Sequence, residues 1–134
     1  VEVCDPRADL VENSPIDNAP VINAMPDDWL REKSLDQQTA VIALCHDPRI
    51  DDMALMEALQ DSDAFYIGAM GSERTSHQRK ERLAMLDISE TQISKLHAPV
   101  GLSIGSKTPP EIAIAILAEL TSLRAQVRKD AGSK

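Results

Sequence analysis

Four short apolar runs, separated by longer polar stretches, define the pattern of this chain. They cover residues 1–5, 39–45, 64–70 and 99–104. The run at 39–45 is almost continuously apolar, as expected of a strand buried on both faces of a sheet. Residues 53–59, between the two middle runs, place apolar side chains at helical spacing. The order strand, helix, strand predicts a right-handed βαβ crossover and therefore parallel strands.

Helices are predicted where apolar side chains recur every three to four residues after a capping residue. The predicted segments are 27–33, 48–61, 72–86, 89–96 and 108–127. Asp47 caps the second of these, and Pro48 fits its first position because the missing N–H does no harm there. Thr108 and Glu111 form a capping box at the start of the last. Its apolar stripe is expected to cover the sheet and consists of Ile112, Ile116, Leu120, Leu123 and Val127.

The other segments show no clear period. Residues 8–38 are rich in Pro, Asn and Asp. We expect them to be irregular apart from the helix at 27–33; so long a connection either carries some structure or is a functional loop. Residues 129–134 are expected to form a frayed tail. The sequence predicts a single α/β domain over 1–134, with a three-layer, Rossmann-like parallel sheet.

Composition narrows the function classes. The hydrophobic share of 43% and the charged share of 27% are typical of a globular domain. A net charge of −8 and a scarcity of aromatic residues argue against a nucleic-acid partner. Cys4 and Cys45 lie in or beside apolar runs and are expected to be reduced core thiols. No stretch approaches the roughly 18 apolar residues of a membrane span, and no signal peptide is recognisable. A cytoplasmic protein with no membrane partner is the expectation.

The stretch from Phe65 to Thr75 is the strongest candidate for a ligand site. An apolar run ends in Gly68 and Gly71, and Ser72 then begins a charged helical segment. Such a strand–turn–helix presents backbone N–H groups and the positive end of the helix dipole, which favour an anion. Arg74, one turn from the glycines, is placed to reach that anion. The alternative is that glycine and serine only make the turn, because short glycine-rich turns are weak signals.

Other charged positions have simpler interpretations. Asp5, at the carboxyl end of the first run, is where a dinucleotide-binding fold holds a ribose, but it is also a common turn residue. The basic side of the 72–86 helix, which includes Arg79 and Arg82, is interpreted as a solvated face. Asp51 and Asp52 suit the first turn of a helix, so we assign no metal site. No base is placed beside a nucleophile, and we assign no catalytic residue.

Three segments together resemble one known family. They are Cys4–Arg7, Tyr66–Ser72 with Arg74 and Thr75, and Leu96–Gly105 with Thr108–Ala113. In this combination the chain resembles the C-terminal Rossmann-like domain of the XdhC/CoxI family, the maturation factors of xanthine and carbon monoxide dehydrogenases. The His46–Asp47 pair also fits the pattern. The resemblance covers nearly the whole chain except the 8–38 region.

The resemblance implies an accessory factor rather than an enzyme. Members of the family bind molybdenum cofactor, a pterin phosphate (molybdopterin) that often carries a cytosine nucleotide. They protect it while a cysteine desulfurase exchanges an oxo ligand for sulfide, and they deliver it to the apo-molybdoenzyme. The implied binding role of His46 and His97 is to supply polar partners for the ring edges. The full set of candidate cofactor-binding residues is Asp5, His46, Gly68, Gly71, Ser72, Arg74 and His97.

The sequence departs from the family pattern in two ways. Family members carry a glycine-rich strand–turn–helix just before the Asp-Pro-Arg segment, and a separate N-terminal domain. We therefore expect a sheet that is incomplete at its N-terminus, without its first βα unit. Glu73 stands where relatives commonly have a basic residue, which weakens the attraction for an anion.

Two other functions remain as alternatives. An NAD(P)-dependent oxidoreductase is disfavoured, and NAD is not the expected ligand, because the glycine-rich turn that holds the pyrophosphate is missing. The chain could also be a docking module that binds no small molecule. Whatever the function, the missing first strand would leave apolar strand edges exposed, which predicts a homodimer. The alternative to a dimer is direct pairing of residues 1–5 with residues 39–45.

Overall fold

The strands form two small parallel sheets. The structure, a computed structural model, describes residues 1–45 and 47–132. In the first sheet β1 (Val3–Asp5) pairs with β2 (Val21–Asn23). In the second, β4 (Tyr66–Ala69) lies between β3 (Ala40–Ala43) and β5 (Leu96–His97). All the ladders are parallel, so the carboxyl ends of the strands within each sheet meet at one edge.

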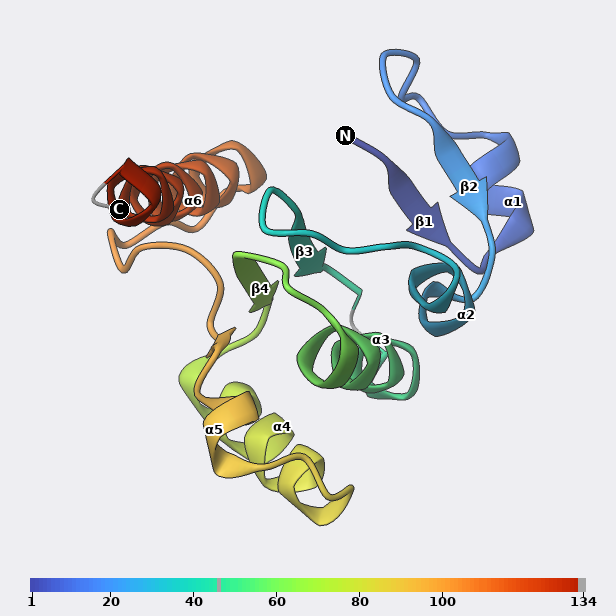
Figure 1. The fold of residues 1–134 in the computed structure, drawn as a ribbon. Helices are drawn as coiled ribbons and strands as arrows, with labels where there is room; N and C mark the ends of the chain where they lie inside the picture. The colour runs from blue at the N-terminus through green and yellow to red at the C-terminus, as the bar shows by residue number, and fades with distance from the viewer. Residues whose placement is uncertain (46, 133–134) are drawn as a thin grey trace.

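Helices lie on both sides of the larger sheet. They are α1 (Ala8–Glu12), α2 (Pro26–Arg31), α3 (Pro48–Asp61), α4 (Glu73–Met85), α5 (Glu90–Ile93) and α6 (Pro109–Gly132). Figure 1 shows α6 on one side of β3 and β4, with α3, α4 and α5 on the other. This arrangement confirms the predicted three-layer α/β architecture. None of the described helices is long and apolar enough to cross a membrane.

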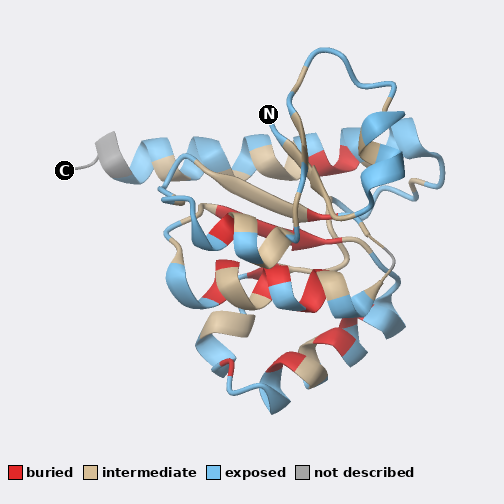
Figure 2. Ribbon diagram, turned by 90° about the vertical axis from the view of Figure 1, so that its right-hand side faces the viewer, coloured by how far each residue is buried: buried red, intermediate tan, exposed pale blue. Residues whose placement is uncertain are grey.

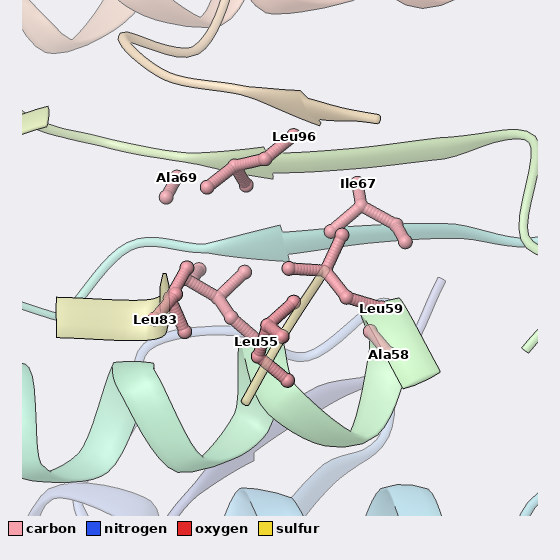
Figure 3. Close-up of a cluster of buried hydrophobic side chains, with 9 residues drawn as sticks. Leu55, Ala58, Leu59, Ile67, Ala69, Leu83 and Leu96 are labelled. Carbon is pink, nitrogen blue, oxygen red and sulfur yellow. The ribbon is translucent and has the colours of Figure 1, made fainter. Parts of the chain in front are cut away.

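The main core lies between the larger sheet and the helices α3 and α4. Ile67 and Ala69 of β4 face Leu55 and Leu59 of α3 and Leu83 of α4 (Figure 3). Buried positions concentrate on β4 and the inner sides of α3 and α4, whereas β1, β2 and β3 are mostly half-buried and most of α6 is exposed (Figure 2). The predicted stripe of α6 does face inward, but past Ile116 it is only half-buried. The helix therefore packs on the sheet mainly through its first half.

The structure corrects the predicted fold at four places. The helix predicted over 89–96 ends at Ile93, and Leu96 already belongs to the strand β5. Residues 99–104 do not form a strand: Gly101 has φ +91°, and the Leu102 N–H donates to the Ala115 carbonyl of α6, so the chain turns away after β5. The 8–38 region carries more structure than the predicted helix, because it contains α1 and β2 as well as α2. The tail predicted to fray at 129–134 is helical to Gly132, and residues 133–134 lie outside the described residues.

The pairing of β1 also rules out the arrangement that the sequence left open as the alternative to a dimer. Residues 1–5 do not pair with residues 39–45; β1 pairs with β2 instead. The Asn23 side chain donates to the Asp5 backbone carbonyl at 3.0 Å and ties the ends of β1 and β2 together. Within the described residues, no strand joins the two sheets.

Candidate functional site

The turn between β4 and α4 carries the predicted anion site. Met70 and Gly71 lead from β4 to Ser72, which is the N-cap of α4. Ser72 and Thr75 form a capping box: the Ser72 N–H donates to Thr75 Oγ1 at 2.8 Å, and the Thr75 N–H donates to Ser72 Oγ at 3.1 Å. A Cβ on Gly71 would lie 2.7 Å from Thr75 Oγ1, so the capping box leaves room only for glycine. The strand–turn–helix expected from the sequence is confirmed.

The donors available at this turn differ from the expected ones. The Ser72 N–H is occupied by Thr75 and is not free for a ligand. Among the described residues, the N–H groups of Gly71, Glu73 and Arg74 have no hydrogen-bond partner. The Arg74 side chain is exposed and has no ion-pair partner within the described part of the chain. The turn thus offers three backbone donors and one exposed cation, beside the opposing charge of Glu73.

Asp5 is held by its own loop. Its carboxylate accepts from the Arg7 backbone N–H at 2.9 Å and from the Arg7 guanidinium at 3.0 and 2.8 Å. These hydrogen bonds, with the positive charge of Arg7, keep the pKa of Asp5 below its ordinary value. Asp5 is therefore ionised, but a ribose hydroxyl would have to compete with Arg7 for its oxygens.

His97 lies on the sheet face that α6 covers. Its ring stacks on Tyr66 with centroids 4.6 Å apart and 7° between the planes, and Nδ1 is 3.6 Å from Glu119 Oε1. The Tyr66 hydroxyl donates to the same Glu119 carboxylate, which also accepts from the Gly101 N–H. None of the contacts that the structure gives His97 reaches the Gly71–Arg74 turn. His46, the other predicted ring partner, lies outside the described residues.

Gly68 has a packing role beside Tyr66, His97 and Glu119, which together form the Tyr66 cluster. A Cβ at this position would lie 2.7 Å from Tyr66 Cε1 and 2.6 Å from Val100 Cγ2. The absence of a side chain lets the Tyr66 ring lie flat over the strand. The predicted site residues thus separate into the turn (Gly71, Ser72 and Arg74), the Asp5 loop, and the Tyr66 cluster (Gly68 and His97).

The sequence interpretation missed a buried ionic cluster behind the turn. Arg79 of α4 is only 6% exposed and lies 3.3 Å from Asp52 and 3.8 Å from Asp51 of α3. Arg82 pairs with Asp52 at 2.7 Å. The solvated-face interpretation is wrong for Arg79, and the two aspartates do more than begin a helix. The signal was present as acidic and basic pairs on consecutive helices, but the inward direction of Arg79 depends on helix packing.

The cysteines are also less buried than expected. Cys4 and Cys45 are both free thiols, and each is partly exposed rather than in the core. Burial, followed by the charge of Asp5, raises the pKa of the Cys4 thiol. Within the described residues, no cluster of His, Cys, Asp or Glu could hold a metal ion.

Comparison with known protein families decides the family of this chain. The XdhC Rossmann domain family matches residues 1–120. The chain belongs to the XdhC family. This assignment confirms the resemblance seen in the Asp-Pro-Arg, glycine-turn and Leu96–Gly105 segments.

Individual relatives agree with the family assignment. The XdhC domain is 34% identical over 96 residues to the molybdenum cofactor insertion chaperone PaoD of Escherichia coli, a match that covers 72% of this chain and 30% of PaoD. It is 30% identical over 107 residues to a Bacillus subtilis protein described as a probable xanthine dehydrogenase subunit, covering 80% of this chain and 30% of that protein. A crystal structure from Bacillus halodurans, described as a xanthine dehydrogenase, superposes with a TM-score of 0.76 and 31% identity over 93% of this chain and 35% of that one. The chain spans about a third of the length of these relatives.

The environment of the Tyr66 hydroxyl in this XdhC domain can be tested by a pH titration. Burial, then the hydrogen bond to Glu119 and its negative charge, raise the pKa of Tyr66. Because the pKa of Tyr66 is raised in the folded domain, its protonated hydroxyl stabilises the fold. This stabilisation is complete below the ordinary tyrosine pKa of about 10 and is lost as the pH rises through the folded-state pKa. Tyr66 is the only tyrosine, so absorbance at alkaline pH should show no ionisation near pH 10 until the domain unfolds. Glu119→Gln should move that ionisation to lower pH; ionisation of the folded wild-type protein at the ordinary pKa would contradict the geometry.

Proposed function

We propose that this XdhC domain binds molybdenum cofactor, as molybdopterin or its cytosine dinucleotide, and takes part in its insertion into a molybdoenzyme of the xanthine or carbon monoxide dehydrogenase type. The observation that carries the proposal is the β4–α4 turn, with three unpaired N–H groups and the exposed Arg74 within the described residues, in a chain of this family. A pterin phosphate needs such donors and a nearby cation. The role is that of an accessory protein without turnover in the cytoplasm, where a cysteine desulfurase would be its second partner.

Ligand-induced stabilisation distinguishes this function from its alternatives. A ligand that binds only the folded state raises the melting temperature increasingly as its concentration exceeds Kd. Differential scanning of the full chain with released molybdenum cofactor, CTP and NADH should show stabilisation by the cofactor. Stabilisation by NADH alone would favour an oxidoreductase, and stabilisation by none of the three would favour a docking module.

Arg74→Ala should weaken the binding of a phosphate-bearing ligand by about 1.5–3 kcal/mol, because a charge-assisted contact is lost. This corresponds to roughly a tenfold to hundredfold rise in Kd. The measurement is isothermal titration with the cofactor, or with CTP if it binds. Arg128→Ala, which removes an exposed arginine of α6, is the matched control for charge. Unchanged affinity in a folded Arg74→Ala protein would remove Arg74 from the site.

We further propose that the chain forms a homodimer. Two observations support this: β1 and β3 are edge strands within the described residues, and Ile114 and Leu117 of α6 are each 60% exposed. Unpaired edges and exposed apolar side chains favour association with a second copy. Sedimentation equilibrium at micromolar concentration should give twice the chain mass of 14.6 kDa. A clean monomer mass would reject the dimer.

A further inference from the structure

The backbone of Met70 is held by hydrogen bonds to two other elements, and its carbonyl belongs to the Met70–Gly71 peptide unit. The Met70 N–H donates to the Ala43 carbonyl of β3 at 2.9 Å. The Met70 carbonyl accepts from Arg79 Nη1 at 3.1 Å. The first contact continues the β3–β4 ladder by one residue, whereas the second comes from a helix that starts after the turn. Arg79 therefore reaches back to the peptide unit that opens the candidate site.

The orientation of that peptide unit sets the direction of the Gly71 N–H. In a trans peptide the carbonyl and the following N–H point in opposite directions. Because Arg79 is buried and draws the Met70 carbonyl toward itself, the Gly71 N–H points away from the core. Gly71 is exposed, and its N–H has no partner within the described residues. A hydrogen bond to the carbonyl also polarises the peptide and strengthens the N–H as a donor.

Arg79 can act as a rigid support because its charge is compensated where it lies. Asp52, itself only 8% exposed, contacts both Arg79 and Arg82, and Asp51 Oδ2 lies 3.8 Å from Arg79 Nη2. The planar fork of arginine can contact a carboxylate and a carbonyl at the same time in a fixed geometry, whereas a lysine ammonium is a compact charge without that fork. The cluster thus links the first turn of α3 to the second half of α4 and, through the Met70 carbonyl, to the β4–α4 turn.

We propose that Arg79 is a positioning residue for anion binding: it holds the Met70 carbonyl and thereby aims the Gly71 N–H at the phosphate of the ligand. This role rests on the proposed function, since it presupposes an anion at the β4–α4 turn. Through Arg79, the buried ionic cluster would contribute to ligand binding as well as to packing.

The test compares Arg79→Lys with Arg82→Lys in the full chain. Both variants keep the charge and disturb the Asp52 contact, but only Arg79 touches the Met70 carbonyl. In ¹H–¹⁵N spectra without ligand, Arg79→Lys should shift the Gly71 amide signal, and Arg82→Lys should leave it in place. Titration with inorganic pyrophosphate should show affinity reduced about tenfold in Arg79→Lys only, as expected from the loss of one well-directed donor.

Two outcomes would overturn the role of Arg79. One is a Gly71 signal that does not move in folded Arg79→Lys; the other is an equal shift in Arg82→Lys. If Arg79→Lys does not fold, Asp52→Asn weakens the anchor of Arg79 while keeping both atoms of the Met70 contact, and it must shift the same signal. Absence of pyrophosphate binding by the wild-type protein would count against the proposed function, whereas the ligand-free Gly71 signal tests the positioning separately.

Discussion

Arg79→Met is expected to lower the free energy of unfolding by about 3–5 kcal/mol, the usual cost of removing one partner from a buried ion pair. Methionine fills much of the volume but removes part of the positive charge that compensates Asp51 and Asp52, and both carboxylates are nearly buried. The Met70 carbonyl loses its hydrogen bond as well. Denaturant unfolding followed by circular dichroism measures the change.

The control for this variant is on the same helix. Arg74→Met replaces an exposed arginine that has no ion-pair partner among the described residues, so its effect should stay within about 0.5 kcal/mol. Equal stabilities of the two variants would mean that Arg79 is not in the buried cluster and that α4 is rotated relative to α3.

Gly68→Ala is expected to destabilise the domain by about 3 kcal/mol, at the upper end of the usual cost of overpacking. The added methyl group would lie 2.7 Å from Tyr66 Cε1 and 2.6 Å from Val100 Cγ2, closer than carbon atoms can approach. Tyr66 is 1% exposed, and its hydroxyl is bound to Glu119, so the ring has little freedom to move. Thermal and denaturant unfolding of the variant check the value.

The double variant Tyr66→Leu with Gly68→Ala provides the matched control. If the clash with the ring is the cause, the alanine should cost much less in the Tyr66→Leu background than in the wild-type background. An equal cost in both would place the strain at Val100 Cγ2, which both backgrounds keep.

The strands β1, β3 and β4 and the long helices were predictable because each follows a local pattern. The apolar run at 39–45 and the capping residues Asp47, Ser72 and Thr108 indicate the elements β3, α3, α4 and α6 to within a few residues. The strand β2, by contrast, has only three residues, and the sequence around it favours turns. Its pairing with β1 is a long-range contact that no local pattern reveals.

The site was predictable only in part, for the same reason. The glycine turn and Arg74 follow from a local motif, and the structure places them together. The occupation of the Ser72 N–H depends on the Thr75 side chain, which the sequence interpretation did not use. The position of His97 depends on its stacking with Tyr66, and that of Arg79 on the packing of α4 against α3. Such contacts are set by tertiary structure and cannot be read from spacing.

Binding of molybdenum cofactor at the β4–α4 turn is the central claim. The most direct test is to incubate the full chain with released cofactor, remove the unbound fraction by gel filtration, and measure the pterin retained by its fluorescence after oxidation. We expect the wild-type and Arg128→Ala proteins to retain the cofactor and Arg74→Ala to retain much less. A folded wild-type protein that retains no pterin, or an Arg74→Ala protein that retains as much as the wild type, would contradict the claim.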